Sequence, residues 1–301
     1  SAFTVPETGA RYVSTAEGDS AHAEGQGGLA QGIASHVEGR MCIAKGQLSH
    51  SEGRETVSDG TGSHSEGVFT QAVGRASHAE GESTIANGDF SHAEGHSTHA
   101  SGTYAHVEGF ENFSTNYAAH AEGRWNHAEG VAAHAEGSTT YAVNDAAHAE
   151  GTCTRASGVA SHAEGSSYDG IDTTASGKAA HAEGQGTTAS GDGSHAEGRN
   201  SKAGGALSHA EGNSTETASE ASHAEGKNTK ATKIAAHAEG QGTQATGNYA
   251  HAEGTGSKAT ATGAHAEGSW TNATGDDAHT EGASTYATGK NSHAEGKGTY
   301  A

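Results

Sequence analysis

Histidine and glutamate are the residues of this chain that could do chemistry, because they return together at a fixed spacing. The motif His-x-Glu-Gly occurs 21 times in 301 residues, first at His22 and last at His293. An imidazole beside a carboxylate can exchange protons, form an ion pair or bind a metal such as zinc. Almost every motif histidine follows the previous one by 14 residues; an additional motif at His127 and five extra residues before His181 are the exceptions. The element that positions the pair therefore repeats with the same period.

A fixed short period predicts a solenoid, in which each repeat is one turn and buries its inner face by stacking on its neighbours. Composition alone would indicate disorder, because Leu, Ile, Val and Phe supply only 23 residues and the formal net charge is -21. A solenoid does not need a Leu-rich core, since its backbone groups pair between turns and Ala, Ser and Thr fill a thin interior.

Each 14-residue unit divides into two similar halves of seven. The first half is Ser-His-Ala-Glu-Gly plus two residues, as in residues 194–200, and the second is Thr-x-Ala-Ser-Gly plus two, as in residues 187–193. We predict that each half is a short strand closed by a glycine turn, with glycine supplying the positive φ of a tight corner. The expected fold is all-β, a parallel β-roll (β-solenoid) with 14-residue turns and two short strands per turn.

Strand alternation assigns the faces of this roll. His and Glu share one outer face, whereas the Ala between them points inward and meets the Ala of the second half. The position seven residues after each histidine lies on the opposite outer face and varies, being apolar early in the chain and polar late. This predicts drift at exposed sites, packing against a neighbouring chain, or a binding stripe. The candidate receptor contacts are Leu29, Ile43, Val57, Ile85, Phe113, Tyr141 and, in an inserted loop, Tyr168.

Two segments depart from the repeat. Residues 1–20 lack the motif and contain the only proline, Pro6, so we expect an N-terminal cap or the end of a preceding segment. Residues 21–301 are predicted to form one continuous roll, with a loop insertion near 166–173 that bulges from it. His127 should occupy a second-half position. The chain stops within a repeat, so we expect it to be a piece of a longer protein.

The His/Glu face is constrained, because both residues return in every repeat while other exposed positions drift. A row of glutamates about 4.8 Å apart is unfavourable in isolation, which predicts burial against the same face of other copies. Three rolls around an axis would let imidazole N–H groups donate to carboxylates across chains, and this would raise the histidine pKa. The predicted trimer-core residues are His22, Glu24, His36, Glu38, His78, Glu80, His92, Glu94, His195, Glu197, His251 and Glu253.

The repeat resembles the head repeats of YadA-type trimeric autotransporter adhesins, whose inner strand reads Asn/Ser-Val-Ala-Ile-Gly. Residues 35–39 (Ser-His-Val-Glu-Gly) and 91–95 (Ser-His-Ala-Glu-Gly) align with it, and the likeness covers about residues 21–301. It implies a left-handed β-roll assembled as a parallel homotrimer, with His and Glu where the family has the axis-facing Val and Ile. The Ser-His-Ala-Glu-Gly variant also looks like repeats in phage tail fibres, which implies an extracellular location on a virion tail or a bacterial cell surface.

Several functions are disfavoured by the sequence. Lys and Arg total only 16 and form no patch, so no nucleic acid is expected as a partner. No hydrophobic run approaches 18 residues, so no membrane insertion is expected. No enzyme is expected, because Ser and His are adjacent in the motif and point to opposite faces, and His-Glu-x-x-His is absent. Cys42 and Cys153 are too far apart along the stack to form a disulfide.

Two binding alternatives stay open. No cofactor is predicted, yet three imidazoles around a threefold axis could hold a metal or an anion. Thr recurs just before the variable position, as at Thr84 and Thr187, and a regular row of Thr is a possible ice-binding surface. Strand alternation, however, turns these side chains inward. We therefore predict a non-enzymatic structural or adhesive fibre segment, a homotrimer that binds a cell-surface glycan or protein receptor or acts as a rigid spacer. The alternative is a monomeric metal-, ice- or surface-binding solenoid.

Overall fold

A computed structural model describes residues 2–4 and 11–301 of the chain. The described residues form 42 β-strands and contain no helix, as the sequence predicts for an all-β solenoid. No helix capable of crossing a membrane occurs among them. The chain divides into two compact units, an N-terminal unit of residues 1–146 and a C-terminal unit of residues 147–301.

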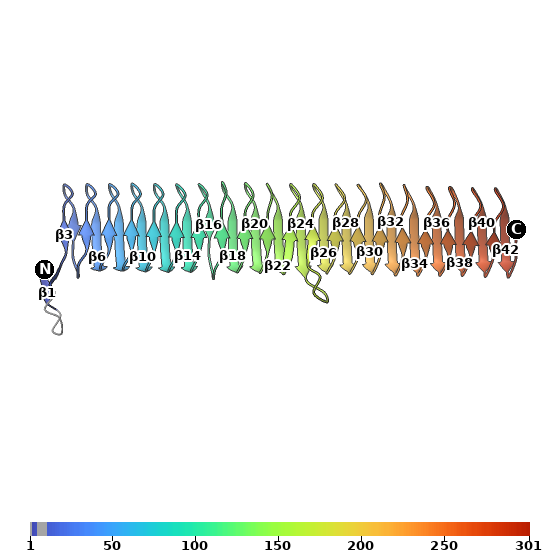
Figure 1. The fold of residues 1–301 in the computed structure, drawn as a ribbon, viewed down its shortest axis with the longest axis horizontal. Coiled ribbons are helices and arrows are strands. Elements are labelled where there is room, and N and C mark those ends of the chain that lie inside the picture. Colours follow the sequence, from blue (N-terminus) through green and yellow to red (C-terminus); the bar gives the residue numbers. More distant parts are fainter. Residues whose placement is uncertain (1, 5–10) are drawn as a thin grey trace. The chain divides into compact units, whose positions relative to one another are not determined.

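The motif strands stack in parallel into one sheet in each unit, which we call the His/Glu sheet (Figure 1). Partners are 14 residues apart and in register, so that His78 pairs with His92 and Glu80 with Glu94. In the N-terminal unit these strands are β4 (His22–Ala23), β6 (His36–Arg40), β8 (His50–Arg54), β10 (His64–Val68), β12 (His78–Glu82), β14 (His92–His96), β16 (His106–Val107), β18 (His120–Arg124) and β20 (His134–Ser138). In the C-terminal unit they are β22 (His148–Thr152), β24 (His162–Ser166), β26 (His181–Gln185), β28 (His195–Arg199), β30 (His209–Asn213), β32 (His223–Lys227), β34 (His237–Gln241), β36 (His251–Thr255), β38 (His265–Ser269), β40 (His279–Ala283) and β42 (His293–Lys297).

Shorter strands from the second half of each repeat stack in parallel into the second sheet, which we call the variable sheet. In the N-terminal unit they are β3 (Thr15–Ala16), β5 (Leu29–Ala30), β7 (Ile43–Ala44), β9 (Val57–Ser58), β11 (Gln71–Ala72), β13 (Ile85–Ala86), β15 (His99–Ala100), β17 (Phe113–Ser114), β19 (His127–Ala128) and β21 (Tyr141–Ala142). In the C-terminal unit they are β23 (Thr154–Ala156), β25 (Thr173–Ala175), β27 (Thr188–Ala189), β29 (Lys202–Ala203), β31 (Glu216–Thr217), β33 (Lys230–Ala231), β35 (Gln244–Ala245), β37 (Lys258–Ala259), β39 (Asn272–Ala273) and β41 (Tyr286–Ala287).

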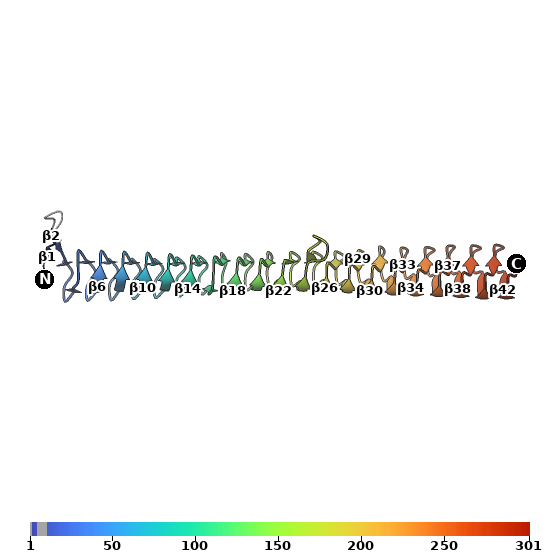
Figure 2. The same cartoon turned by 90° about the horizontal axis from the view of Figure 1, so that it is seen from below.

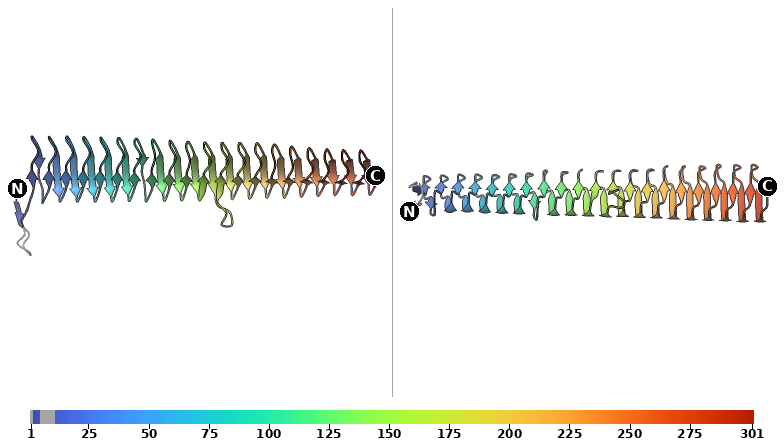
Figure 3. Two further views of the ribbon diagram at one scale, coloured as in Figure 1. Left: turned by 45° about the horizontal axis from the view of Figure 1, so that its top comes forward. Right: turned by 60° about the horizontal axis from the view of Figure 1, so that its bottom comes forward.

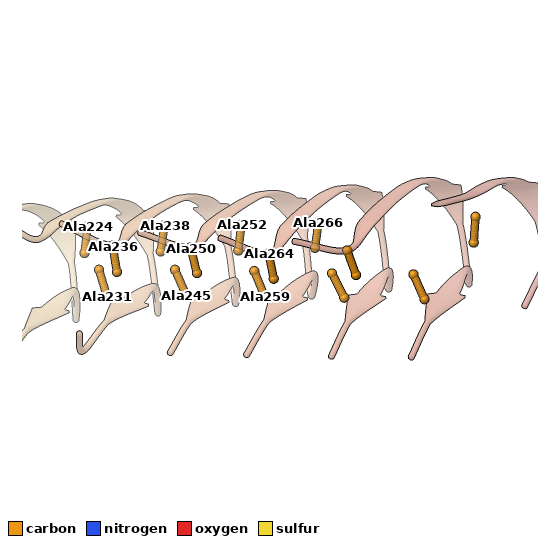
Figure 4. Packing of buried hydrophobic residues seen from close by; sticks show 14 residues of the cluster. Ala224, Ala231, Ala236, Ala238, Ala245, Ala250, Ala252, Ala259, Ala264 and Ala266 are labelled. Atoms are coloured by element: carbon orange, nitrogen blue, oxygen red, sulfur yellow. The ribbon is translucent and has the colours of Figure 1, made fainter. Parts of the chain in front are cut away.

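The two sheets of each unit lie as two layers with alanine between them (Figure 2). Ala252 of the His/Glu sheet and Ala259 of the variable sheet are both completely buried, and their methyl groups point into the space between the layers (Figure 4). The prediction that alanine rows meet inside the roll is confirmed. Because a methyl group is short, the layers approach closely, and the small apolar content of the sequence is enough to fill the interior.

Glycine has two different roles in each turn, and only one of them was expected. The motif glycine has a positive φ, as at Gly39 (φ 115°), where an added Cβ would also overlap the carbonyl oxygen of Gly53 in the next turn. The second-half glycine, such as Gly46, has no positive φ. Glycine is required there because an added Cβ would overlap the carbonyl oxygen of Gly60. The expectation that glycine supplies the positive φ at both corners is therefore wrong for the second half.

The corners place non-glycine residues in the left-handed region instead. Met41 and Phe69 have φ of 57° and 59° at one corner, and Leu48 and Phe90 have φ of 57° and 58° at the other. Each costs about 1–2 kcal/mol for a residue with a Cβ. The backbone hydrogen bonds between successive turns, such as Phe69 N–H to the Arg54 carbonyl at 3.0 Å, hold these corners in place.

Two segments depart from the repeat: one lies at the N-terminal end of the stack, and the other projects from its side. At the N-terminus β1 (Ala2–Thr4) pairs antiparallel with β2 (Arg11–Val13), and β3 already joins the variable sheet within residues 1–20; Pro6 lies outside the described residues. The inserted residues form a tight hairpin in which Tyr168 and Ile171 exchange backbone hydrogen bonds of 2.8 and 2.9 Å. Figure 3 shows this loop leaving the C-terminal unit beside β24 and β26.

Candidate functional site

The motif histidines form one continuous face in each unit. From His36 to His134, and again from His148 to His293, neighbouring ring centroids are 4.7–4.9 Å apart. This spacing follows from the strand separation, because each histidine of the His/Glu sheet pairs in register with the histidine of the next turn, as His78 does with His92 and His237 with His251. The rings therefore lie one on the other, most of them stacked nearly parallel.

Each histidine has the glutamate of its own strand beside it. The Nε2 atom of His120 lies 3.4 Å from Oε2 of Glu122, and the corresponding distance from His251 to Glu253 is 3.8 Å. The Nε2 atom of His22 lies within hydrogen-bond distance of the Glu24 carboxylate, at 3.4 Å. The Nε2 atoms of His78, among many others, are shielded by the neighbouring turns and have no hydrogen-bond partner within the chain. In strands such as those of His120 and His251, an imidazole nitrogen thus lies near a carboxylate without forming a hydrogen bond to it.

Within each unit, the structure brings the predicted trimer-core residues together on the His/Glu face. The N-terminal unit supplies His22, Glu24, His36, Glu38, His78, Glu80, His92 and Glu94, and the C-terminal unit supplies His195, Glu197, His251 and Glu253. In the single chain they are half-buried or exposed; the side chains of His251 and Glu253 are 36% and 45% exposed. The described chain by itself leaves the face open.

The histidine pKa is lowered along this face in the single chain. Burial lowers the pKa of the histidines below 6.5, and for most of them the charge of a stacked neighbouring histidine lowers it further, while the glutamates oppose this only partly. The affected residues are His64, His92, His99, His120, His127, His162, His195, His223, His237, His251 and His279. In the single chain burial and the charge of neighbouring rings both penalise a protonated imidazole. The raised pKa expected in an assembled trimer stays a prediction.

The same residues form groups that meet the distance requirement for holding a metal. His64, Glu66 and His78, for example, have ligand atoms within 4.8 Å of one another. The directions of these atoms fit a shared ion less well. The rings of His64 and His78 are inclined by only 6°, so their nitrogen lone pairs run side by side rather than converging, and both Nε2 atoms are shielded. A common ion would require the rings to turn out of the stack.

The variable sheet of the N-terminal unit carries a column of half-buried apolar side chains. The predicted contacts Leu29, Ile43, Val57, Ile85, Phe113 and Tyr141 all lie in it. Its second part is a ring stack, because Phe113 lies between His99 and His127 with centroids 4.9 and 5.0 Å away. His127 belongs to β19 of this sheet and pairs with Phe113, so the prediction of a second-half position is confirmed. The rings cover one another's faces and expose mainly their edges.

The seventh predicted contact, Tyr168, is not part of that column. It lies in the hairpin of the C-terminal unit, where the guanidinium carbon of Arg199 is 5.1 Å from the centre of its ring. The threonines before the variable position face the interior; Thr84 and Thr187 are completely buried. Both cysteines, Cys42 and Cys153, are free thiols.

Sequence reasoning missed a hollow surface at one corner of the C-terminal unit. Two adjoining hollows of about 260 and 270 Å³ share Asn228 as a wall; the first lies beside Lys202 and Lys230, the second beside Lys258 and Trp270. We call them together the corner groove. A signal for it was present in the sequence, because the position five residues after the histidine is small or polar through this unit, with Trp270 as the exception.

No protein-family model matches this chain, and a search of curated protein sequences finds no match either.

Proposed function

We propose that this chain is a structural and adhesive fibre segment in which three copies pack through their His/Glu faces as a left-handed parallel β-roll trimer. The observation that carries the proposal is the row of part-exposed glutamate carboxylates stacked in register turn after turn, as at Glu52 and Glu253, which lie 3.7 and 3.8 Å from the histidine Nε2 atom of their own strand. Like charges placed directly opposite one another on adjacent strands are unfavourable. A second copy facing the row can supply hydrogen-bond donors to these carboxylates.

The charge on this face supports the same arrangement. Glutamates such as Glu225 and Glu239 stack in register along the sheet while lowered pKa values keep the histidines between them neutral, so the face is a row of negative charge near neutral pH. Imidazole N–H groups from another copy would satisfy these carboxylates and remove them from mutual repulsion. An extracellular location, on a virion tail or a bacterial surface, completes the proposal and follows from the resemblance to adhesin and tail-fibre repeats.

Native mass tests the assembly directly. We expect light scattering on a gel-filtration column to give about 90 kDa, three times the chain mass of 29.9 kDa, with no change when a chelator is added. A monomer would overturn the trimer and leave the His/Glu face to another ligand. A trimer that a chelator dissociates would replace hydrogen bonding by metal binding as the force that holds the copies together.

A pair of variants tests whether the His/Glu face is the interface. Replacing Glu239 by Ile alone leaves His237 facing unmatched groups and should destabilise the trimer by about 3 kcal/mol. Replacing His237 by Val and Glu239 by Ile together makes that turn apolar and should restore most of the loss. Replacing Lys230 of the variable sheet by Val, together with Thr232 just after that strand by Ile, is the control. This double variant should leave the native mass unaltered. Equal effects of the single and double changes on the His/Glu face would contradict a paired interface.

A further inference from the structure

The corner groove follows one edge of the variable sheet in the C-terminal unit. It runs between the corner residues and the outward side chains of β29 to β37, from Asn200 to Trp270. Five turns separate these two residues, so the groove extends over about 24 Å at roughly 4.8 Å a turn. It is hollow because the corner between Asn228 and Trp270 is built from glycine; an added Cβ at Gly242 would meet no atom within 4 Å.

Trp270 closes one end of the groove and is placed as a platform. Its ring lies over the backbone of the preceding turn, since a Cβ added to Gly256 would be 2.7 Å from the indole. The residue is 61% exposed, and no described side chain accepts a hydrogen bond from its indole N–H. An aromatic ring held flat against a backbone keeps its outer face free for a ligand.

The other tryptophan occupies the equivalent corner position of its repeat and is engaged by its own chain. The indole N–H of Trp125 donates to Glu111 at 2.9 Å, and the guanidinium of Arg124 lies 4.3 Å from its ring centre. The exposed fraction of Trp125 is 41%, against 61% for Trp270. The free indole is therefore a feature of the groove rather than of the corner.

Positive charge and amide groups line the rest of the groove. Glu216 binds Lys230 at 2.6 Å, whereas no carboxylate among the described residues forms an ion pair with Lys202 or Lys258. Asn228 stands between the two hollows and offers both a donor and an acceptor. In a chain of net charge -21, unpaired lysines beside a hollow are a local exception.

We propose that the corner groove binds an acidic glycan, with the apolar face of one sugar on Trp270, hydroxyl groups on Asn228, and a carboxylate on Lys258 or Lys202. A flat aromatic platform with adjacent amides and a cation offers apolar, hydrogen-bonding and charged contacts to the same ligand. Nucleic acid would require many more cations than these. The site deepens the adhesive part of the proposed function. It lies along the corner and the variable sheet, and no motif His or Glu lines it, so it does not depend on the trimer.

The native protein, labelled and applied to an array of neutral, uronic-acid and sialic-acid oligosaccharides, tests the proposal. We expect retention on acidic glycans and weaker retention on their neutral counterparts. Replacing Trp270 by Ala should weaken binding about tenfold or more, and Lys258→Ala should reduce the preference for acidic over neutral glycans. No retention on any glycan would overturn the proposal, and equal retention of neutral and acidic glycans would overturn its charge component.

Matched variants separate the site from general damage. Trp125→Ala removes the same side chain from the equivalent corner and should leave glycan binding unchanged. Gly256→Ala should displace the Trp270 ring and weaken binding, whereas Gly62→Ala, with a similar φ of 66°, open space around it and a place outside the groove, should not. Unaltered binding by Trp270→Ala would overturn the proposal. A native mass of one chain with intact glycan binding would overturn the trimer alone, so the two failures are distinguishable.

Discussion

The two units have the same kind of interior and the same His/Glu face, but they differ on the variable face. Both bury alanine rows between two parallel sheets and stack histidines at 4.7–4.9 Å on the His/Glu sheet. On the variable sheet the N-terminal unit carries a half-buried apolar column that ends in the stack of Phe113, whereas the C-terminal unit carries exposed charges such as Lys230 and Lys258. The same backbone thus supports opposite surface chemistry.

This difference shows which positions specify the solenoid and which are available for function. At a position whose side chain contacts only the equivalent side chains of adjacent turns, the residue type can vary, provided that it varies together over several successive turns. A residue that meets backbone cannot, because the backbone of the next turn is the same everywhere. The predictions below use substitutions that should act equally in both units or differently in each.

The largest effect is expected from the motif glycines, equally in both units. Gly81→Ala and Gly240→Ala each force a side chain into a φ above 100° and into a carbonyl of the next turn, which should cost roughly 3–5 kcal/mol. The controls Gly62→Ala and Gly242→Ala have φ of 66° and 68° with nothing within 4 Å, and should cost about 1 kcal/mol. Urea midpoints of the four variants measure this. Similar midpoints for clash and control variants would show that the turns separate to admit a methyl group.

Acid should destabilise both units of the unassembled chain, because their histidine ladders are alike. The folded pKa of residues such as His92 and His237 lies below 6.5, so the unfolded chain takes up protons first as pH falls. Stability is therefore full above about pH 6.5 and is lost as pH falls toward the lowered folded values. Melting temperature measured from pH 8 to pH 5, with hydrogen exchange to follow each unit, tests the sign. A melting temperature that rises in acid would indicate that carboxylates of other copies reverse the shift in the assembled protein.

The smallest effects are expected on the variable sheet, where they should differ between the apolar column of the N-terminal unit and the exposed charges of the C-terminal unit. Phe113→Ala removes a half-buried ring with two stacking partners and should cost about 1–2 kcal/mol. Lys230→Ala removes one exposed ion pair with Glu216 and should cost less than about 1 kcal/mol, with a dependence on salt. Thermal unfolding at low and high salt measures both. A salt-dependent loss for Phe113→Ala, or a larger loss for Lys230→Ala, would contradict the assignment of the columns.

Much of this architecture follows from local rules applied to the sequence. A 14-residue period and strand alternation place Ala252 inside and His251 and Glu253 together on one face, without knowledge of any distance. They also place His127 in the variable sheet, since seven residues are half a turn. These predictions hold because the side-chain direction in a strand depends on the parity of the position alone.

Other features depend on what lies 14 residues away, and the sequence does not display them. Gly46 is required by the carbonyl of Gly60 rather than by its own φ, and the pKa of His237 is lowered by burial and by the ring of His251. The corner groove exists because small residues of several turns come into line beside Trp270. The sequence by itself determined the period, the faces and the alanine interior, since these are local. Only the tertiary structure decided close approach, protonation and surface shape, because each is set by contacts between turns.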